Sequence, residues 1–379
     1  MGFMDRYRSY SELTDEEVRA DFKAQADERR EKELSRVELL DLTSSTADEL
    51  PHPAVAAAIS FAAKRALNHE SDPISSELRD RFAAEAGIPN ARVGVGAGAS
   101  GLLTALVTAL ADSGDRILIP WPAYRLHPVL VRTVGATPIP LEGTSGVESL
   151  ISAAEQKESS PVLILTNPND PDGRLLSAAE VASLRDGLPS TTTLVVDEAL
   201  VDYAGEDHIR AMNDLVADTE GLYLVRSLSK AWGLSGLRVG WVLGGPESEE
   251  IIARLAPVLG VPMPSEAGAL AALEEARPQR DARVKAVTRQ RERLESLLKG
   301  TTVELQPSAS NLVWARVPGI SSEALAAKLR EAGVLVRDGS EVGDDEHICA
   351  AVRGDETATD RLAEGLVGAA AAQPRSSAD

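Results

Sequence analysis

The sequence predicts an α/β fold, in which a large domain with a mostly parallel sheet sandwiched by helices precedes a smaller α+β C-terminal domain. Two patterns predict this architecture. From residue 54 to about residue 245, apolar strands alternate with helical segments, which is typical of a parallel sheet with helices on both faces. Residues 265–298 are then rich in alanine, arginine and glutamate, which predicts a long helix between the domains with a break at Pro278.

The individual elements follow from short apolar runs and the residues that flank them. In the large domain, strands are expected from residue 93 and at residues 116–119, 162–165 and 195–197, with helices at residues 102–110, 123–134 and 178–188. In the small domain, strands are expected near residue 303 and at residues 312–317, 334–336 and 348–352, with a helix at residues 323–332. We place the domains at residues 46–260 and 261–371, after a charged arm or helix at residues 1–45 and before a disordered tail at residues 372–379.

Composition argues against several classes of function. The chain has 379 residues, 43% of them hydrophobic, which is enough for one large core and a smaller one. Its formal net charge of −20 argues against nucleic acid or an anionic membrane as a partner. A single cysteine, Cys349, excludes an internal disulfide and is typical of a reducing cytoplasm. The five histidines show no metal-binding spacing, and no apolar run has membrane-spanning length.

Lys230 lies in the most informative segment of the chain, residues 227–238, which reads Ser-Leu-Ser-Lys-Ala-Trp-Gly-Leu-Ser-Gly-Leu-Arg. A lysine that condenses with an aldehyde must be deprotonated and held in place. Ser227, Ser229 and Arg238 would supply charge-assisted hydrogen bonds to a phosphate beside that aldehyde. The cofactor with both groups is pyridoxal phosphate. A basic loop that leads into a strand has the same composition, so other segments must decide between the two interpretations.

Asp197 ends a β-branched run, as expected of a buried parallel strand that carries an acid at its C-terminal end. An ionised carboxylate there would keep the pyridine nitrogen of the cofactor protonated, so that the ring can accept the electrons of a substrate carbanion. The alternative is an acid that caps the next helix, which is common for aspartate after a strand.

A glycine-rich run at residues 94–101 leads from the first strand into an apolar helix and leaves unpaired backbone N–H groups where a phosphate could bind. The donors would be Ala99 and Ser100. The run also matches the G-x-G-x-x-G pattern of dinucleotide-binding folds, which requires an acidic residue at the end of the second strand. That strand is followed here by Pro120, Trp121 and Pro122 without an acid, so the dinucleotide interpretation is disfavoured.

Together with Tyr124 and the turn at residues 167–173, these segments resemble the fold-type I pyridoxal-phosphate enzymes, specifically the class I/II aminotransferases nearest to histidinol-phosphate aminotransferase. The resemblance covers roughly residues 40–366. It implies that Lys230 forms the Schiff base, that Asp197 pairs with the pyridinium, that Tyr124 stacks on the ring, and that the chain is a homodimer. It also implies a phosphate site made of Ser227, Ser229, Arg238 and the amides of Ala99 and Ser100.

The sequence departs from this family at several positions. Leu200 stands where relatives carry a tyrosine, and Asp170 stands where they carry an asparagine, so both usual donors to the cofactor's phenolic oxygen are replaced. Because a carboxylate disfavours a neighbouring phenolate, the resting cofactor is expected to be neutral there and to absorb at shorter wavelength. Glu70 stands where relatives carry a tyrosine that reaches the partner subunit's phosphate.

The usual arginine for the substrate's anionic group is also missing. It lies four residues before a glycine of the C-terminal strand in relatives, and here that position is Ala350. Arg353 is expected on the opposite face of the strand as a surface charge, because side chains alternate along a strand. It could serve only if the register slips by one residue or a bulge re-aims it. Arg337 keeps its position and is the expected binder of an anion, with Asn311 and Glu70 as further substrate-binding candidates.

We therefore expect a cytoplasmic aminotransferase that acts on an amino acid or amine derivative through a Lys230 Schiff base and a quinonoid intermediate. The same carbanion can lead to other products, depending on which bond is perpendicular to the ring. A lyase, decarboxylase or oxidative deaminase of secondary metabolism on the same fold is the alternative. A binding protein that has lost turnover is disfavoured, since it has no need for Lys230, Asp197 and Arg238 together.

Overall fold

The computed structural model describes residues 39–142, 146–157, 160–255 and 260–371. Residues 1–38 of the charged arm expected at residues 1–45 lie outside the described residues. The tail expected at residues 372–379 also lies outside them. The chain divides into two compact units. The large unit contains Thr46–Asp170 and Arg174–Val284; the small unit contains Pro171–Gly173 with the described parts of Met1–Ser45 and Lys285–Asp379.

A seven-stranded sheet forms the centre of the large unit. Its strand order is β2 (Val93–Gly96), β8 (Gly240–Gly244), β7 (Leu222–Ser227), β6 (Thr193–Asp197), β5 (Val162–Thr166), β3 (Arg116–Pro120) and β4 (Thr137–Leu141). Strand β8 is antiparallel to both of its neighbours, and the other neighbouring pairs are parallel. The mostly parallel sheet predicted from the sequence is therefore confirmed.

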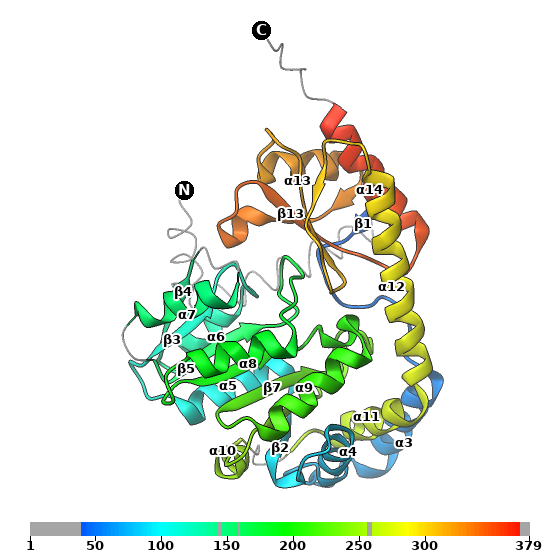
Figure 1. Cartoon of the computed structure of the whole chain (residues 1–379). Coiled ribbons are helices and arrows are strands. Elements are labelled where there is room, and N and C mark those ends of the chain that lie inside the picture. The colour runs from blue at the N-terminus through cyan, green and yellow to red at the C-terminus, as the bar shows by residue number, and fades with distance from the viewer. Residues whose placement is uncertain (1–38, 143–145, 158–159, 256–259, 372–379) are drawn as a thin grey trace. The chain divides into compact units, whose positions relative to one another are not determined.

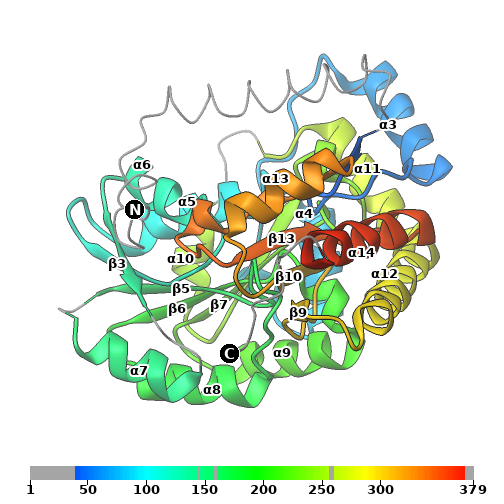
Figure 2. The ribbon, with the colours of Figure 1, turned by 90° about the horizontal axis from the view of Figure 1, so that it is seen from above.

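Helices cover both faces of this sheet (Figure 2). Helices α5 (Gly98–Leu110) and α6 (His127–Thr133) pack against each other, while α7 (Val147–Glu155), α8 (Ala178–Gly187) and α9 (Glu206–Asp218) lie along the other face. The helix expected at residues 123–134 is shorter than predicted. It begins only at His127, where Pro128 occupies the first turn, a position that requires no N–H donor. The preceding residues form a loop that carries Tyr124.

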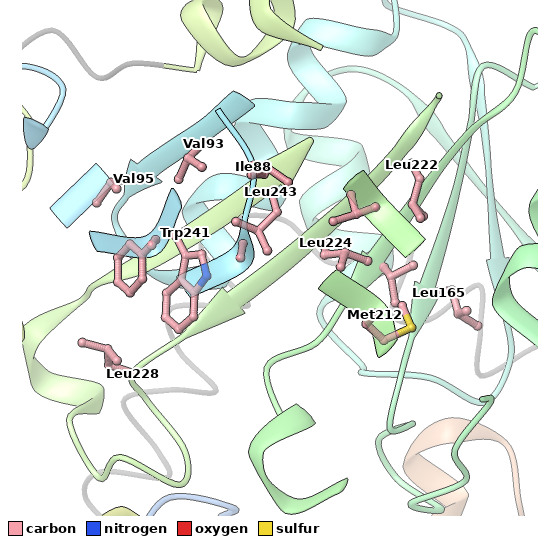
Figure 3. Close-up of a cluster of buried hydrophobic side chains, with 14 of the residues drawn as sticks. Ile88, Val93, Val95, Leu165, Met212, Leu222, Leu224, Leu228, Trp241 and Leu243 are labelled. Atoms are coloured by element: carbon pink, nitrogen blue, oxygen red, sulfur yellow. The ribbon is translucent and has the colours of Figure 1, made fainter. Parts of the chain in front are cut away.

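The core of the large unit lies between the sheet and its helices, and Figure 3 shows part of it around β2, β7 and β8. The rings of Phe82 and Trp241 stack with centroids 4.1 Å apart and planes inclined by 7°. Phe82 belongs to α4 (Ser76–Ala86). Helix α3 (Pro53–Ala66) packs against α11 (Met263–Glu275), and α10 (Glu249–Arg254) follows β8 (Figure 1).

The small unit has an antiparallel four-stranded sheet in the order β12 (Arg337–Asp338), β13 (His347–Ala351), β10 (Leu312–Arg316) and β9 (Glu304–Leu305). Its helices are α13 (Ser322–Glu331) and α14 (Glu356–Ala371), and β1 (Leu40–Asp41) pairs in parallel with β11 (Val334–Leu335). The long helix expected at residues 265–298 is two helices, α11 and α12 (Arg277–Leu298), which are separated at Ala276. No helix within the described residues has the length and apolarity needed to cross a membrane.

Candidate active site

Asp197 is held at the C-terminal end of β6 by a buried histidine. Its side chain is only 6% exposed, and its Oδ2 accepts a hydrogen bond of 2.9 Å from Nε2 of His127, which is fully buried. Its Oδ1 accepts a second hydrogen bond, of 3.0 Å, from the backbone N–H of Ala199. Both oxygens of Asp197 are thus oriented by the protein itself.

His127 was not recognised as a site residue from the sequence. It begins α6, and its ring makes a T-shaped contact with that of Tyr124, with ring centroids 5.4 Å apart and planes inclined by 81°. Its contact with Asp197 joins residues 70 positions apart in the chain, so no local pattern indicates it. The only signal in the sequence is its position shortly after Tyr124, which was itself predicted to contact the cofactor.

Lys230 lies in the bend that follows β7. It is half-buried, and its carbonyl oxygen accepts a hydrogen bond of 2.9 Å from the N–H of Gly233. Gly233 has a positive φ of 71°, and a Cβ there would lie 3.2 Å from the guanidinium of Arg283. Both the backbone conformation and the space therefore favour glycine at this turn. The N–H of Leu234 donates to the carbonyl of Leu228 over 2.9 Å, which closes the loop that carries Lys230.

The N-terminus of α5 forms a cradle with Arg238. Gly98, the first residue of the helix, has a φ of 74°, and a Cβ there would lie 2.5 Å from Nη2 of Arg238. Arg238 itself is left-handed, with a φ of 53°, and donates to the carbonyl oxygens of Ser235 and Ala97 over 3.2 and 3.4 Å. The N–H groups of a first helical turn, which have no partner within the helix, and a guanidinium therefore face the same small region, which suits an anion.

Gly240 brings this cradle against the sheet. A Cβ on Gly240 would lie 2.7 Å from the backbone carbon of Gly98 and 2.9 Å from the backbone nitrogen of Ala99. Gly240 also pairs with Ser227 across β7 and β8. Ser227 and Ser229 are 4% and 9% exposed, and the N–H of Ser229 donates to Oγ of Ser227 over 3.3 Å. The structure therefore brings together most of the predicted phosphate site: Ala99, Ser227, Ser229, Arg238 and, next in α5, Ser100.

Asp170 and Leu200 are both buried, at 7% and 3% exposure. The turn that carries Asp170 is held by its neighbours: Asn167 exchanges two hydrogen bonds with the backbone of Leu176, at 2.8 and 2.9 Å, and Asn169 donates to the carbonyl of Pro122 over 3.1 Å. The turn is thus held by the side chains of Asn167 and Asn169, and it places Asp170 in a buried position after β5.

Each predicted substrate-binding residue of the small unit has its own set of contacts. Asn311 is buried and donates to the carbonyl of Ser45 over 2.9 Å, and Nη2 of Arg337 lies 2.8 Å from Sγ of Cys349. Ala350 is fully buried opposite Val313. Arg353, which was expected to be a surface charge, is half-buried and donates to the carbonyl of Asp41 over 2.8 Å. In the large unit, Glu70 is exposed and follows α3.

The large-unit residues fit pyridoxal phosphate. Strands β6 and β7 are parallel, so Asp197 and Ser227 end at the same edge of the sheet, and Gly96 and Gly240 pair at that edge as well. A buried, doubly hydrogen-bonded carboxylate suits a protonated ring nitrogen, and the Gly98–Arg238 cradle suits a phosphate. Lys230 follows β7 at the same edge and would meet the aldehyde. Ligands of open α/β sheets bind outside the carboxyl ends of the strands, where these groups lie.

Residues 37–366 match the model of the family described as aminotransferase class I and II. Two similar proteins are the aromatic amino acid aminotransferases of Thermobifida fusca and Corynebacterium jeikeium. The first is 31% identical over 299 residues, which is 78% of this chain and 82% of the relative. The second is 31% identical over 305 residues, which is 79% of this chain and 81% of the relative.

Solved structures with a similar fold are also aminotransferases. The histidinol-phosphate aminotransferase of Sinorhizobium meliloti, in complex with pyridoxal-5'-phosphate, has a TM-score of 0.76 and 23% identity over 88% of this chain and 91% of that chain. The aspartate aminotransferase of Rhizobium meliloti has a TM-score of 0.77 and 20% identity over 97% and 98% of the two chains. These similarities show that the fold is that of the fold-type I enzymes.

Proposed function

Because this chain belongs to the class I and II aminotransferases, and is therefore a pyridoxal-phosphate enzyme, we propose that it takes the amino group from an aromatic amino acid. The substrate is supported by the relatives at 31% identity that carry this name. The observation within this chain that supports a catalytic pyridoxal-phosphate site is the buried His127–Asp197 pair at the end of β6. A relic without turnover would have no need to keep such a carboxylate desolvated and oriented.

The roles of the residues follow from their positions. When bound, pyridoxal phosphate supplies an aldehyde that condenses with amines and a ring that accepts electrons from the substrate carbon. Lys230 would hold the aldehyde through its ε-amine and, once released, would move the proton at the substrate carbon as general base. Asp197 would keep a proton on the ring nitrogen, and His127 would keep the Asp197 carboxylate in place. Tyr124 would lie against the ring.

The phosphate would be bound by the cradle at the N-terminus of α5. Arg238 would supply a positive charge, and the N–H groups of the first helical turn would supply oriented donors. The donors of the cradle would be Ala99, Ser100, Ser227, Ser229 and Arg238. Because Gly240 allows α5 to approach the sheet, the cradle would lie close enough to the Lys230 loop to fix the cofactor at both ends.

Asp170 and Leu200 would lie on the phenolic side of the cofactor. Leucine cannot donate a hydrogen bond, and an ionised aspartate only accepts them. The phenolic oxygen would therefore keep its proton more readily than in an enzyme with two donors there. The expected consequence is an absorption band at shorter wavelength.

Arg337 would bind the anionic group of the substrate. Ala350 offers no charge. Arg353 donates to the carbonyl of Asp41 and Arg337 to Sγ of Cys349, and of the two only Arg337 keeps the position that the resemblance assigns to an anion-binding residue. A guanidinium is the group that binds a carboxylate most strongly, through two parallel hydrogen bonds. Asn311 and Glu70 would contribute further polar contacts to the substrate.

A homodimer is supported by exposed apolar side chains on and beside α3. Within the described residues, Leu50, Phe61, Leu67 and Ile74 are 84, 61, 75 and 37% exposed, and only two other large apolar side chains reach comparable exposure. Concentrated exposed apolar side chains are typical of an interface. Replacement of Phe61 and Leu67 by aspartate should lower the mass measured by light scattering to that of a monomer, whereas Leu297→Asp should not. An unchanged dimer would exclude this surface as the interface.

A reducing cytoplasm remains the proposed location, supported by a single cysteine, Cys349, which is buried in β13. The functional domains are proposed at residues 46–260 and 261–371.

Product analysis tests the proposed function. The purified holoenzyme is mixed with phenylalanine, tyrosine or tryptophan and a 2-oxo acid, and the expected products are the aromatic 2-oxo acid and a new amino acid. Release of ammonia or carbon dioxide, or uptake of oxygen, would instead indicate the lyase, decarboxylase or oxidative alternatives. Borohydride should fix the cofactor on Lys230, and a Lys230→Ala variant should lose both this adduct and turnover.

A further inference from the structure

A buried ion pair lies directly behind the cofactor-facing residues. Nε of Arg226 donates to Oε2 of Glu198 over 2.7 Å, and the two side chains are 6% and 0% exposed. Glu198 is the residue after Asp197, and Arg226 is the residue before Ser227. The ion pair therefore joins the ends of β6 and β7 at the positions next to two proposed cofactor contacts.

The pair points to the opposite face of the sheet from the Asp197 carboxylate. Nη1 of Arg226 donates to Oδ1 of Asn213, in α9, over 2.8 Å, whereas Asp197 contacts His127, in α6. Helices α6 and α9 cover opposite faces of the sheet (Figure 2). Because adjacent side chains alternate across a strand, a residue anchored on one face fixes the direction of its neighbour on the other.

Stability alone gives little reason for this pair. Burial raises the pKa of the Glu198 carboxyl group, although Arg226 acts in the opposite direction. Oε1 of Glu198 and Nη2 of Arg226 are buried and have no hydrogen-bond partner among the described residues. A buried ion pair with incomplete hydrogen bonding is commonly no more stable than an apolar replacement. Because burial of this ion pair is energetically unfavourable, we infer that the pair has a role in positioning its neighbours.

Backbone hydrogen bonds around Glu198 hold this residue and Asp197 in place. The N–H of Glu198 donates to the carbonyl of Val225 over 2.8 Å, and its carbonyl accepts from the N–H of Val201 over 3.0 Å. The carbonyl of Asp197 accepts from the N–H of Asn167 over 2.9 Å. With its side chain tied to Arg226 as well, residue 198 is fixed in both position and rotation. The carboxylate of Asp197, one residue away, is then fixed with it.

We propose that the Glu198–Arg226 ion pair, supported by Asn213, is a positioning element that holds Asp197 and Ser227 at the spacing that the cofactor requires. The proposal rests on the proposed cofactor roles of Asp197 and Ser227. Arg226 and Glu198 touch neither cofactor nor substrate and act through their neighbours. Loss of the Arg226 side chain would leave the ends of β6 and β7 joined by backbone hydrogen bonds alone, and the Asp197 and Ser227 side chains would be held less firmly at the spacing that the cofactor would require.

A cavity beside Arg226 allows a chemical rescue experiment to test this proposal. It has a volume of about 280 Å³, and its walls include Arg226, Asn213, Arg210 and Glu206. The side chains of Arg210 and Glu206 are 70% and 64% exposed, so the cavity is open to solvent at that end. A free guanidinium ion can therefore reach the place of the missing side chain in an Arg226→Ala variant.

The matched control is Arg92, another buried arginine of the large unit. It is 8% exposed, against 5% for Arg226, and it donates to the backbone carbonyls of Gly244, Val216 and Ala217 over 2.9, 3.1 and 3.0 Å. Gly244 is at the end of β8 remote from Gly240. An Arg92→Ala variant therefore loses a comparable buried guanidinium without releasing the strand ends that carry the proposed cofactor contacts.

The experiment compares holoenzymes of the wild type and of the Arg226→Ala, Arg226→Lys and Arg92→Ala variants. A displacement of the reacting groups by about 1 Å can lower kcat by about 100-fold, which is the expected loss for Arg226→Ala. Guanidinium chloride, at concentrations that leave Arg92→Ala folded, should restore at least part of this loss, whereas potassium chloride of equal ionic strength should not. Arg226→Lys keeps the positive charge but loses the planar guanidinium that bonds Glu198 and Asn213 together. This variant should bind pyridoxal phosphate about tenfold more weakly.

Each outcome decides the matter. The proposal is overturned if Arg226→Ala loses thermal stability like Arg92→Ala but keeps the wild-type kcat, cofactor affinity and pH titration of the cofactor absorption. If Arg226→Ala does not fold, Arg226→Lys decides, and wild-type values for that variant overturn the proposal. Failure of the proposed function itself would be seen separately, because the wild type would then show no lysine-bound chromophore.

Discussion

Gly240 offers the most direct test of the proposed phosphate site. A Cβ at this position would lie 2.7 Å from the backbone carbon of Gly98 and 2.9 Å from the backbone nitrogen of Ala99. Ordinary contacts of a Cβ begin at 3.4 Å, so the N-terminus of α5 must move away from β8 by about 0.7 Å, the difference between 3.4 and 2.7 Å. The third close atom is the carbonyl oxygen of Arg226, in β7, at 2.8 Å. All three are backbone atoms, and the contact cannot be relieved by a change of rotamer.

The expected effect of Gly240→Ala is a loss of phosphate binding. Overpacking of this kind costs about 1–3 kcal/mol, and each 1.4 kcal/mol corresponds to about a tenfold change in affinity. If the strain is relieved by moving the cradle, the affinity for pyridoxal phosphate should fall by roughly 10- to 100-fold. The affinity for pyridoxal, which has no phosphate, should change much less, because the end of β6 is not displaced.

The assay is an absorbance titration of the apoenzyme with each compound, together with a thermal unfolding curve. The matched control is Gly236→Ala, since a Cβ at Gly236, in the same loop, would meet no atom within 4 Å. This variant should bind both compounds like the wild type. If Gly240→Ala weakened pyridoxal and pyridoxal phosphate equally, or weakened neither, the assignment of the phosphate to the α5 cradle would be refuted.

Three further outcomes are expected. His127→Ala should raise the cofactor's dissociation constant by roughly 10-fold or more, because it removes a buried hydrogen bond to a charged group worth about 1.5–3 kcal/mol. His127→Gln should lose less cofactor affinity, because glutamine can still donate a hydrogen bond to Asp197. Equal losses of affinity in both variants would contradict this role. Asp170→Asn combined with Leu200→Tyr should shift the cofactor absorption to longer wavelength, and an unshifted band would contradict the proposed phenolic contacts. Burial acts to raise the pKa of Asp344, but hydrogen bonds from His347 and from backbone amides hold it below the usual value. The stability that Asp344 contributes is therefore present above the pKa of its unfolded state and is lost as the pH falls through the pKa of its folded state. In a plot of unfolding temperature against pH, Asp344→Asn should therefore show a smaller decrease toward acidic pH than the wild type.

The large-unit sheet could be predicted from the sequence because its signals are local. Each parallel strand is a continuous apolar run, such as β5 or β6, with a turn signal after it. The boundaries of α6 could not be predicted in the same way. Residues 123–126 have helical composition, but the loop that carries Tyr124 continues to Leu126, and the helix begins only at His127. Tertiary context overrides local propensity at such positions.

The candidate site was predictable only where its residues occur in recognisable segments. Lys230, Arg238 and the serines lie within one stretch of 12 residues, and Asp197 follows a clear strand. His127 and Arg226 had no such signal, because their partners lie 70 and 28 positions away in the chain. Contacts of this kind depend on which strands become neighbours, and a single sequence does not encode that order in any local pattern.

The antiparallel strand β8 explains how one edge of the sheet can hold both the Lys230 loop and the proposed phosphate cradle. In an entirely parallel sheet, the N-terminal end of the strand after the Lys230 loop would lie at the opposite edge from the end of β7. Because β8 runs the other way, Gly240 pairs with Ser227, and the chain returns to the sheet at the edge that it has just left. Arg238 can therefore precede β8 directly and still lie over Gly98. The reversal of one strand thus allows a loop of 12 residues, 228–239, to contribute both the aldehyde-binding lysine and the phosphate-binding arginine proposed for this site.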